Sequence, residues 1–562
     1  MKRLIFTALA LLFTLHASAV TEVRVAVLPV EFQDADFRDI RTGVQKKAAR
    51  ACDYFNDQFT GSRSFSFEVL PVVRVARPCA WYGANSTDSK DRNIDALVRD
   101  ACSLTTSDMS GFDCDGDGRI DNLCIITAGG NEAAGDGPDC IWPRHGLLSA
   151  MGGTAVCGGR TVDSFTICPE SAGLGVFCHE YAHSLGLPDL YDTDGAGSGG
   201  VSKGLWGSLS LMDKGLENDG GETPPNFCAI EMELLGTGKA IQAAVGEFTL
   251  HPLSRSREYL RINAGEGEYY LLECRDNNGW DSATGGCGLL AYRIDKSEAN
   301  FSYSEQYGRD ISSAQRWADN QINCRPDHQC ASLTEASPNA SDVAEVFFPY
   351  DDARAMGFGP DCSLAIDNIS LQSDGSVRFS VIIPVTLYES VVFQDAAILN
   401  WTTDKALDVS SCEISWYPEG REETALRAEV TESLYGNFHI TLEQLFPDTV
   451  YTLVFKVLCK NGTVHSKTGS IRTKSVREGV RPFIYLNSLH RDANGNFLSG
   501  EKLPLRVYNA VGATKVEWYF NERPILPDNE GFWRIAYGGT LKAVVWYWNG
   551  TRDIIIKAMA VQ

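Results

Sequence analysis

One stretch of this chain decides which fold and chemistry it can have: His179-Glu180-Tyr181-Ala182-His183-Ser184-Leu185-Gly186-Leu187-Pro188-Asp189. Positions four apart on a helix lie on the same face, so His179 and His183 can direct two imidazole nitrogens at one metal ion. Glu180 lies about 100° further around the helix axis. From there its carboxylate can reach a water held by the metal without binding the metal itself. The pattern therefore predicts a metal site with a general base beside it.

Two residues predict where this helix ends. Gly186 can adopt the left-handed conformation that closes a helix, and Pro188 cannot continue one. We therefore expect the chain to turn just after His183 and to bring Asp189 back toward the histidines as a third, oxygen ligand. The alternative is that both histidines are surface residues of an ordinary helix. The offsets of Gly186 and Asp189 from the histidines favour the metal site.

Residues 1–19 have the pattern of a secretory signal peptide. Lys2 and Arg3 precede an apolar run from Leu4 to Leu15, and Ala17-Ser18-Ala19 forms a small-residue cleavage site. The run is too short to cross a bilayer, and we expect no integral membrane segment elsewhere. The sequence thus predicts a secreted, extracellular protein, with retention in a periplasm or at the cell surface as the alternative.

The net charge restricts which partners the protein is expected to bind, and the cysteine content bears on whether it forms disulfides after export. The 562 residues carry a formal net charge of −23, and an acidic surface disfavours nucleic acid and anionic lipid as partners. Seventeen cysteines in an exported chain predict disulfides, and the odd count leaves at least one thiol over. The candidate pairs are Cys274 with Cys287, Cys324 with Cys330, and Cys412 with Cys459.

Strand and helix patterns alternate ahead of the metal motif. The segment Val23–Phe32 is mostly apolar and predicts a buried strand. Further patterns predict helices over 42–59 and 92–104, a strand over 122–127, and the metal-binding helix over 171–186. This alternation is typical of an α/β catalytic part.

Blocks of sequence around the motif resemble the immune inhibitor A type of secreted bacterial metallopeptidase, the M6 family. They follow the family's order and spacing over about residues 22–383. The blocks are Leu28 to Asp34, Asp113 to Leu123, Glu132 to Gly135, Ile141 to Pro143, Leu190 to Asp192, Tyr269 to Glu273, Gly279 to Asp281, and Phe347 to Pro349. The resemblance implies one catalytic zinc, a metzincin-like fold and endopeptidase activity on proteins or peptides.

The resemblance also assigns roles at the site. It makes His179, His183 and Asp189 the zinc ligands and Glu180 the general base. Met212 occupies the place of the methionine-containing turn that underlies the metal in metzincins; the alternative is that Met212 only fills core space. The stretches Gly207–Gly215 and Pro224–Asn226 follow the site, and we expect them to line the specificity pocket.

A second metal site is predicted upstream. Asp113, Asp115, Asp117 and Asp121 place carboxylates at alternating positions around a glycine turn, a spacing that suits calcium. A full EF-hand would have Glu where this chain has Cys124. The alternative is a solvated acidic turn ahead of the strand at Asn122.

The predicted fold is multidomain: an α/β metzincin-like zinc peptidase domain over 20–240, its β-rich C-terminal part over 241–384, and two all-β sandwich modules. The module over 385–475 resembles fibronectin type III domains, because Leu445 to Tyr451 resembles a tyrosine corner and Trp401 can anchor the core. Residues 476–562 have alternating strand patterns, as in an immunoglobulin-like sandwich. These modules are candidates for binding an extracellular ligand.

Together these features predict a secreted zinc endopeptidase that uses Glu180 as general base. One alternative is a catalytically inactive homologue that acts as an extracellular binding or adhesion protein through its sandwich modules. Another is a zinc hydrolase that acts on something other than peptides. The intact base and ligands favour catalysis over the first alternative.

Overall fold

The computed structural model describes residues 20–87, 90–358, 362–405, 407–430, 437–460, 462–476, 481–486 and 491–562. The predicted signal peptide, residues 1–19, lies outside the described residues. The chain divides into two compact units: one comprises residues up to Arg354 with Asn368–Phe379, and the other Ala355–Asp367 with Ser380–Gln562. Within the described residues, no helix has both the length and the apolar character needed to cross a bilayer.

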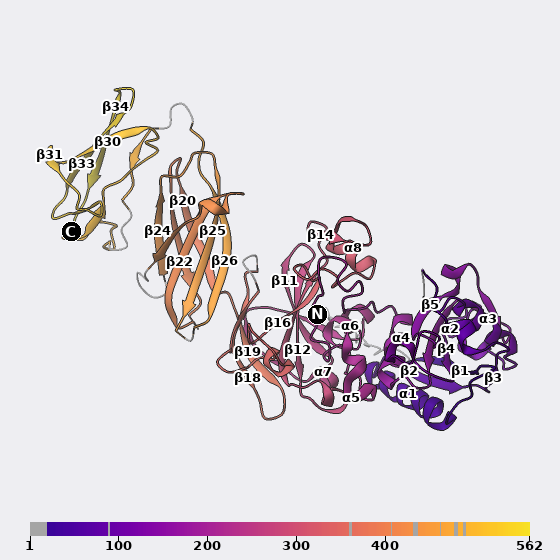
Figure 1. Cartoon of the computed structure of the whole chain (residues 1–562). Helices are drawn as coiled ribbons and strands as arrows, with labels where there is room; N and C mark the ends of the chain where they lie inside the picture. Colours follow the sequence, from indigo (N-terminus) through magenta and orange to yellow (C-terminus); the bar gives the residue numbers. More distant parts are fainter. Residues whose placement is uncertain are drawn as a thin grey trace, which may run out of the picture. The chain divides into compact units, whose positions relative to one another are not determined.

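The first unit begins with a mostly parallel sheet of order β2-β1-β4-β8-β5, to which β3 adds by pairing with β1 (Figure 1). Strands β1, β2, β3, β4 and β8 run parallel, whereas the edge strand β5 is antiparallel to β8. The strands are β1 (Thr21–Glu31), β2 (Arg63–Val69), β3 (Val73–Arg74), β4 (Leu123–Thr127), β5 (Arg144–Leu147) and β8 (Ser164–Pro169). A small hairpin pairs β6 (Ala155–Cys157) with β7 (Arg160–Val162).

Helices cover both faces of this sheet, which explains the apolar run of β1. Val25 and Val27 pack in one core with α1 (Lys47–Gln58) and α4 (Leu174–Ser184). Ala26 and Leu28 face the opposite core, which contains α2 (Cys79–Gly83) and α3 (Ile94–Leu104). The predicted strands and helices of this part are confirmed within a few residues; a π-helical turn, Arg41–Lys46, precedes α1.

The rest of the first unit is rich in strands, as predicted. Its main sheet has the order β16-β13-β12-β11-β9, and a hairpin joins β14 to β15. The strands are β9 (Lys239–Gln242), β10 (Gly246–Leu250), β11 (Glu258–Gly265), β12 (Glu268–Arg275), β13 (Gly288–Asp295), β14 (Phe301–Ser304), β15 (Arg309–Ser312), β16 (Ala331–Thr334), β18 (Ala365–Leu371) and β19 (Val377–Ile382). The helices are α5 (Asn218–Gly221), α6 (Ala229–Leu235), α7 (Leu253–Ser256) and α8 (Ser313–Ala318). The division between the units passes within β18 and β19.

The described residues of the second unit form strands and one short 3-10 helix, Glu422–Thr424. Two sheets, β20-β21-β24 and β23-β22-β25-β26, enclose a core in which Trp401 is fully buried. The Tyr451 hydroxyl accepts a hydrogen bond of 2.8 Å from the backbone N–H of Phe446, which confirms the predicted corner. The strands are β17 (Met356–Gly357), β20 (Val385–Val392), β21 (Ala396–Thr403), β22 (Val409–Pro418), β23 (Leu426–Val430), β24 (Asn437–Glu443), β25 (Val450–Cys459) and β26 (Val464–Arg472).

A further set of strands follows over the C-terminal part of the second unit. Its largest sheet has the order β31-β30-β33-β34 and covers a separate core that contains Trp518 and Leu541. The strands are β27 (Phe483–Ile484), β28 (Lys502–Pro504), β29 (Val507–Tyr508), β30 (Ala513–Phe520), β31 (Arg523–Ile525), β32 (Phe532–Arg534), β33 (Gly539–Tyr547) and β34 (Arg552–Met559).

Two of the predicted disulfides are not formed. Cys274, Cys287, Cys324 and Cys330 are free thiols. Cys274 and Cys324 instead contact oxygen atoms: the Cys274 thiol donates to the carbonyl of Gly375, and the Cys324 sulfur lies 3.1 Å from the Thr193 hydroxyl. The pairing of Cys412 with Cys459 stays a prediction.

Candidate metal centre

Helix α4 carries the predicted site at its C-terminal end. The helix begins at Leu174, later than expected, because Gly173 is in an extended conformation at its N-cap. Gly175 lets the helix approach a neighbouring segment closely: a Cβ atom there would lie 2.1 Å from the Leu216 carbonyl oxygen. The helix ends at Ser184, and Gly186 follows with a φ of 101°, in the left-handed region where glycine is favoured.

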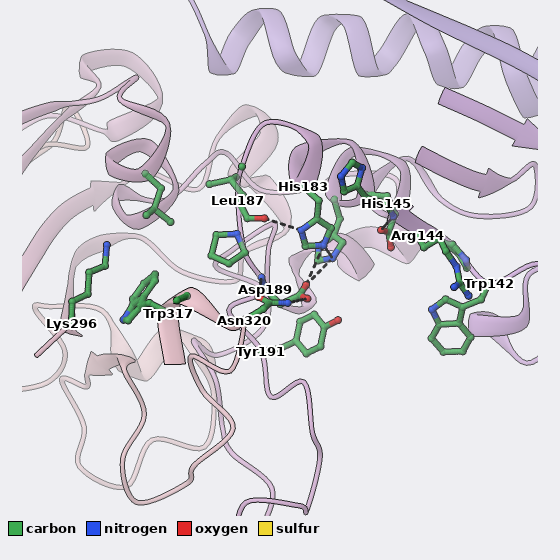
Figure 2. A pocket seen from close by; sticks show the side chains of 17 residues that line it. Trp142, Arg144, His145, His183, Leu187, Asp189, Tyr191, Lys296, Trp317 and Asn320 are labelled. Atoms are coloured by element: carbon green, nitrogen blue, oxygen red, sulfur yellow. Dashed lines mark hydrogen bonds and ion pairs between the residues drawn. The ribbon is translucent and has the colours of Figure 1, made fainter. Parts of the chain in front are cut away.

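The turn after α4 brings the three predicted ligands together. The Nε2 atoms of His179 and His183 are 3.2 Å apart. The Asp189 Oδ1 atom lies 3.2 Å from the first and 3.3 Å from the second. Four-coordinate zinc with bonds of about 2.0–2.1 Å would hold its ligand atoms about 3.3–3.4 Å apart. The three side chains therefore fit a tetrahedral zinc ion (Figure 2).

The other nitrogen of each imidazole is held by a backbone carbonyl. His179 Nδ1 lies 2.9 Å from the Leu211 oxygen, and His183 Nδ1 lies 2.8 Å from the Leu187 oxygen. Because a carbonyl can only accept, each Nδ1 is the donor, and each Nε2 of a neutral ring is left with its lone pair. Two lone pairs and the Asp189 Oδ1 atom then converge, an arrangement that a cation stabilises.

Electrostatics couple the three ligands. Burial disfavours the charged form of the Asp189 carboxyl, but its contacts with His179 and His183 lower its pKa overall. Burial likewise opposes protonation of His179, yet Asp189 and Glu180 raise the pKa of its ring to about 8. Asn320 binds Asp189 twice: its Nδ2 donates to Asp189 Oδ2 at 2.8 Å, and its Oδ1 accepts from the Asp189 backbone N–H at 2.7 Å.

Glu180 lies beside the three ligands, on the side of strand β5. Its Oε2 atom accepts a hydrogen bond of 2.9 Å from the backbone N–H of His145, which fixes the carboxylate from the edge strand. Burial raises the pKa of Glu180. The His145 ring also lines the site, and its burial, together with nearby His183, lowers its pKa to about 4. The base is therefore oriented by a residue that the sequence analysis missed.

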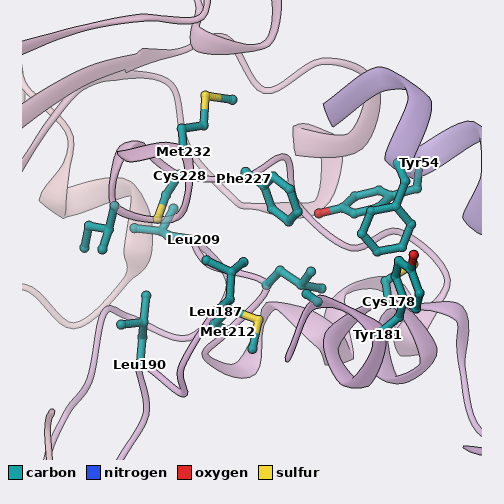
Figure 3. Close-up of a cluster of buried hydrophobic side chains, with 14 of the residues drawn as sticks. Tyr54, Cys178, Tyr181, Leu187, Leu190, Leu209, Met212, Phe227, Cys228 and Met232 are labelled. Carbon is teal, nitrogen blue, oxygen red and sulfur yellow. The ribbon is translucent and has the colours of Figure 1, made fainter. Parts of the chain in front are cut away.

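Met212 lies in the core beneath the site (Figure 3). It is fully buried, and its carbonyl accepts from the backbone N–H of Leu190 at 2.8 Å. The residue before it, Leu211, supplies the carbonyl that holds His179. The backbone N–H of Met212 donates to Glu231 at 3.0 Å, so the fully buried Glu231 carboxylate fixes this turn.

A buried ionic network supports the same turn from the β-rich part. Arg275 pairs with Glu273 at 2.7 Å and with Asp281 at 2.6 Å, and the side chains of all three are at most 2% exposed. Arg275 also donates to the Leu209 carbonyl at 3.1 Å. The sequence blocks that contain Glu273 and Asp281 thus have a structural role: they hold residues 209–212 in place.

The site lies in a cleft with a volume of about 800 Å³. Figure 2 shows Trp142 and Arg144 on one side of His183 and Asp189, and Lys296 and Trp317 on the other. Gly207–Gly215 and Pro224–Asn226 do not line this cleft, so their assignment to the specificity pocket was wrong. These segments pack beneath the site, and residues far along the chain form the wall instead.

The cleft residues that the sequence did not predict differ in whether a sequence pattern could have indicated them. Tyr191 lines the cleft and its ring stacks on His179 with centroids 6.2 Å apart; it stood in a block already singled out for its resemblance. Asn320, Lys296 and Trp317 lie more than 100 residues beyond Asp189 in stretches with no motif. Only the fold brings them to the site.

The acidic loop gathers three of its four predicted residues. Asp113, Asp115 and Asp121 can direct oxygen atoms to within 4.8 Å of one another, whereas Asp117 is not part of this group. Asp117 accepts the backbone N–H of Arg119 at 2.7 Å instead. The Asp113 Oδ1 atom is buried without a hydrogen-bond partner, while Oδ2 accepts from Arg160 at 3.1 Å. The orphaned oxygen is compatible with a cation.

Comparisons with known proteins find similarity to one family of peptidases. Residues 29–234 match the family described as "Immune inhibitor A peptidase M6, catalytic domain". Over 178 residues the chain is 36% identical to "Immune inhibitor A" from Bacillus thuringiensis subsp. alesti, covering 26% of each. It is 32% identical over 176 residues to "Pre-pro-metalloprotease PrtV" from Vibrio cholerae serotype O1 (strain M66-2), covering 26% of this chain and 19% of the relative. The chain thus matches about a quarter or less of the length of these relatives.

Solved structures similar to part of the chain include two β domains. The fn3 domain of human contactin 1 is 21% identical and covers 17% of this chain and 89% of its own, with a TM-score of 0.14. The fn3 domain of the human collagen alpha-1(XX) chain is 21% identical and covers 17% and 86%, with a TM-score of 0.15.

Proposed function

We propose, from the match of residues 29–234 to the M6 peptidase family, that this chain is a secreted zinc-dependent endopeptidase. The observation that carries the proposal is the convergence of His179, His183 and Asp189 with ligand-atom separations of 3.2–3.3 Å, next to the Glu180 carboxylate. The relatives named above are a peptidase-family protein and a metalloprotease, which supports the same activity here.

The metal ligands and Glu180 have separate roles in peptide hydrolysis. A zinc ion bound by the three ligands supplies Lewis acidity that polarises the scissile carbonyl and lowers the pKa of the attacking water. Glu180 accepts a proton from that water and delivers it to the nitrogen of the departing amine as the C–N bond breaks. The raised pKa of the buried Glu180 suits both steps, because the group must take up a proton and then release it.

The rim of the cleft favours an extended peptide as substrate. Strand β5 is the last strand of its sheet, and its residues Arg144 and His145 line the cleft. An edge strand offers backbone N–H and C=O groups that an extended peptide can pair with. A zinc hydrolase for small non-peptide substrates would gain nothing from such an edge, which disfavours that alternative.

The test is casein and peptide hydrolysis by the purified chain. Wild type should cleave, a zinc chelator should stop cleavage, and added zinc should restore it. Glu180→Ala should retain zinc and lose activity by at least about a hundredfold, because general base catalysis contributes 10²–10⁴-fold. Glu217→Ala, an acidic control on another segment, should cleave as wild type does. Inactivity of every zinc-loaded wild-type preparation would favour the binding or adhesion alternative.

Several finer assignments belong to the same proposal. The peptidase domain is metzincin-like over 20–240, Met212 forms the methionine turn, and Gly186 closes the ligand helix. Residues 241–384 are its β-rich part, 385–475 form a fibronectin type III-like module, and 476–562 form an immunoglobulin-like module; an extracellular ligand of these two modules is part of the proposal. The sheets and helices described above support the domain assignments.

Calcium at the acidic loop is also proposed, with Asp113, Asp115 and Asp121 as ligands. The buried, unpartnered Asp113 Oδ1 atom supports it, because such an atom loses stability unless a cation or donor satisfies it. Addition of Ca²⁺ to the chelator-treated chain should raise its melting temperature, and Asp113→Asn should remove that shift. An equal shift in the variant would exclude the site.

A further inference from the structure

Lys296 occupies an unusual position in the wall of the cleft. It follows strand β13, and its ammonium lies 4.3 Å from the centroid of the Trp317 ring. The cleft is lined by one other lysine or arginine, Arg144, on the far side of the metal ligands (Figure 2). Arg144 already has a partner: it forms an ion pair with Asp91, whose side chain is fully buried.

Lys296 has no such partner. Among the described residues, no carboxylate forms an ion pair with its ammonium, and burial lowers its pKa. The carboxylate that acts on it electrostatically, Glu233, is already engaged by Arg261 at 2.8 Å and by the Tyr269 hydroxyl at 2.6 Å. The cleft therefore contains one cation whose charge is not balanced by the protein.

The position of this cation is fixed. The Trp317 indole N–H donates to the Asp295 carbonyl at 2.8 Å, which holds the ring on helix α8. The backbone N–H of Lys296 donates to the Gly267 carbonyl at 2.8 Å. A cation over an aromatic face is attracted by the ring, so the ammonium does not need an anion to stay in place. A side chain that enters this part of the cleft meets a preorganised positive charge and an apolar ring.

We propose that Lys296 and Trp317 form a substrate subsite that takes an acidic side chain, Asp or Glu, at one fixed position relative to the scissile bond. The inference rests on the peptidase function proposed above. The substrate carboxylate pairs with the Lys296 ammonium, and its methylene groups lie against the Trp317 ring. The opposite wall offers no equivalent, because Arg144 is already neutralised by Asp91.

The experiment uses zinc-loaded full-length chain and a set of peptides that differ only by Glu, Gln or Lys at each position around one cleavage site. Wild type should prefer Glu over Gln at one position by about tenfold in kcat/KM, the value of a partly exposed charge-assisted contact. Lys296→Met should bring this ratio to about one, through a fall in kcat/KM for the Glu peptide. Lys296→Glu should prefer the Lys peptide at the same position.

Lys203→Met provides the matched control. The Lys203 ammonium also lies over a tryptophan ring, 3.6 Å from the Trp206 centroid, but it pairs with Glu335 and is outside the cleft lining. This variant should keep the wild-type preference. If zinc-loaded wild type cleaves no peptide, the peptidase function itself fails. If wild type cleaves but the Glu-to-Gln ratio is the same in wild type and Lys296→Met at every position, the subsite is refuted.

Discussion

Asn320 should control how tightly the metal is held, although it does not touch the metal. It contacts Asp189 through two hydrogen bonds, of 2.8 Å to the carboxylate and 2.7 Å from the backbone N–H. Asn320 has a φ of 55°, a conformation that asparagine tolerates better than most residues, so its position is set by the turn after α8. The amide thus orients the one oxygen ligand from a segment 131 residues away.

Replacement of Asn320 by Ala removes both contacts. A hydrogen bond to a charged group contributes about 1.5–3 kcal/mol and a neutral one about 1 kcal/mol, and part of this is recovered by water. We therefore expect a loss of about 2 kcal/mol in zinc binding, which is a rise of about thirtyfold in Kd. The effect should appear in the metal affinity first and in kcat only when zinc is limiting.

The assay is competition for zinc with a chromophoric chelator at fixed pH. Asn300→Ala is the matched control, because the Asn300 amide also makes two hydrogen bonds to carboxylates, Glu268 and Asp295, both at 2.9 Å, but does not contact the metal loop. Its zinc Kd should equal that of wild type. A Kd for Asn320→Ala within threefold of wild type would refute the reasoning, as would an equal loss in the Asn300 control.

Two further predictions concern stability. Arg275→Met should lower the free energy of unfolding by about 3–5 kcal/mol, because it leaves the Glu273 and Asp281 carboxylates buried without a counter-charge. In urea unfolding, the exposed pair of Arg378 with Glu247 in the same unit is the control, and Arg378→Met should cost less than about 1 kcal/mol. The second concerns Asp295, whose burial is outweighed by bonds from His328 and neighbouring groups that lower its pKa to about 2. The carboxylate therefore stabilises the fold above its unfolded pKa of about 4 and loses this contribution, about 2 kcal/mol, as pH falls through 2. Chelator-treated wild type should lose that amount relative to Asp295→Asn over this range, and parallel pH profiles would contradict it.

The sequence predicted what local geometry determines. His179, Glu180 and His183 share a helix, and Gly186 with Pro188 dictates the turn that returns Asp189, so all four positions follow from spacing. The start of the helix was placed three residues early because the pattern continues through Gly173, which the structure shows extended at the N-cap. Tyr451 could be predicted for the same reason: its hydroxyl bonds a residue only five positions away.

Contacts between distant segments could not be predicted. The loop at Asp113 has the carboxylate spacing of a calcium site, but whether each oxygen points inward depends on competing backbone donors, and Asp117 binds the backbone N–H of Arg119 instead. The sequence predicted that segments following the motif line the pocket. Lys296 and Trp317 line the cleft instead, because strand β13 and helix α8 end beside it, and no local sequence pattern indicates this.

The boundary predicted at residue 240 lies inside the first compact unit, which extends beyond it. The metal ligands come from a short stretch, but their orientation depends on the Leu211 carbonyl and on Asn320. The turn that contains Leu211 is in turn held by Arg275 of β12, through the carbonyl of Leu209. Since both Arg275 and Asn320 lie in the β-rich part, that part contributes directly to the metal centre. This explains why the two parts belong to one compact unit.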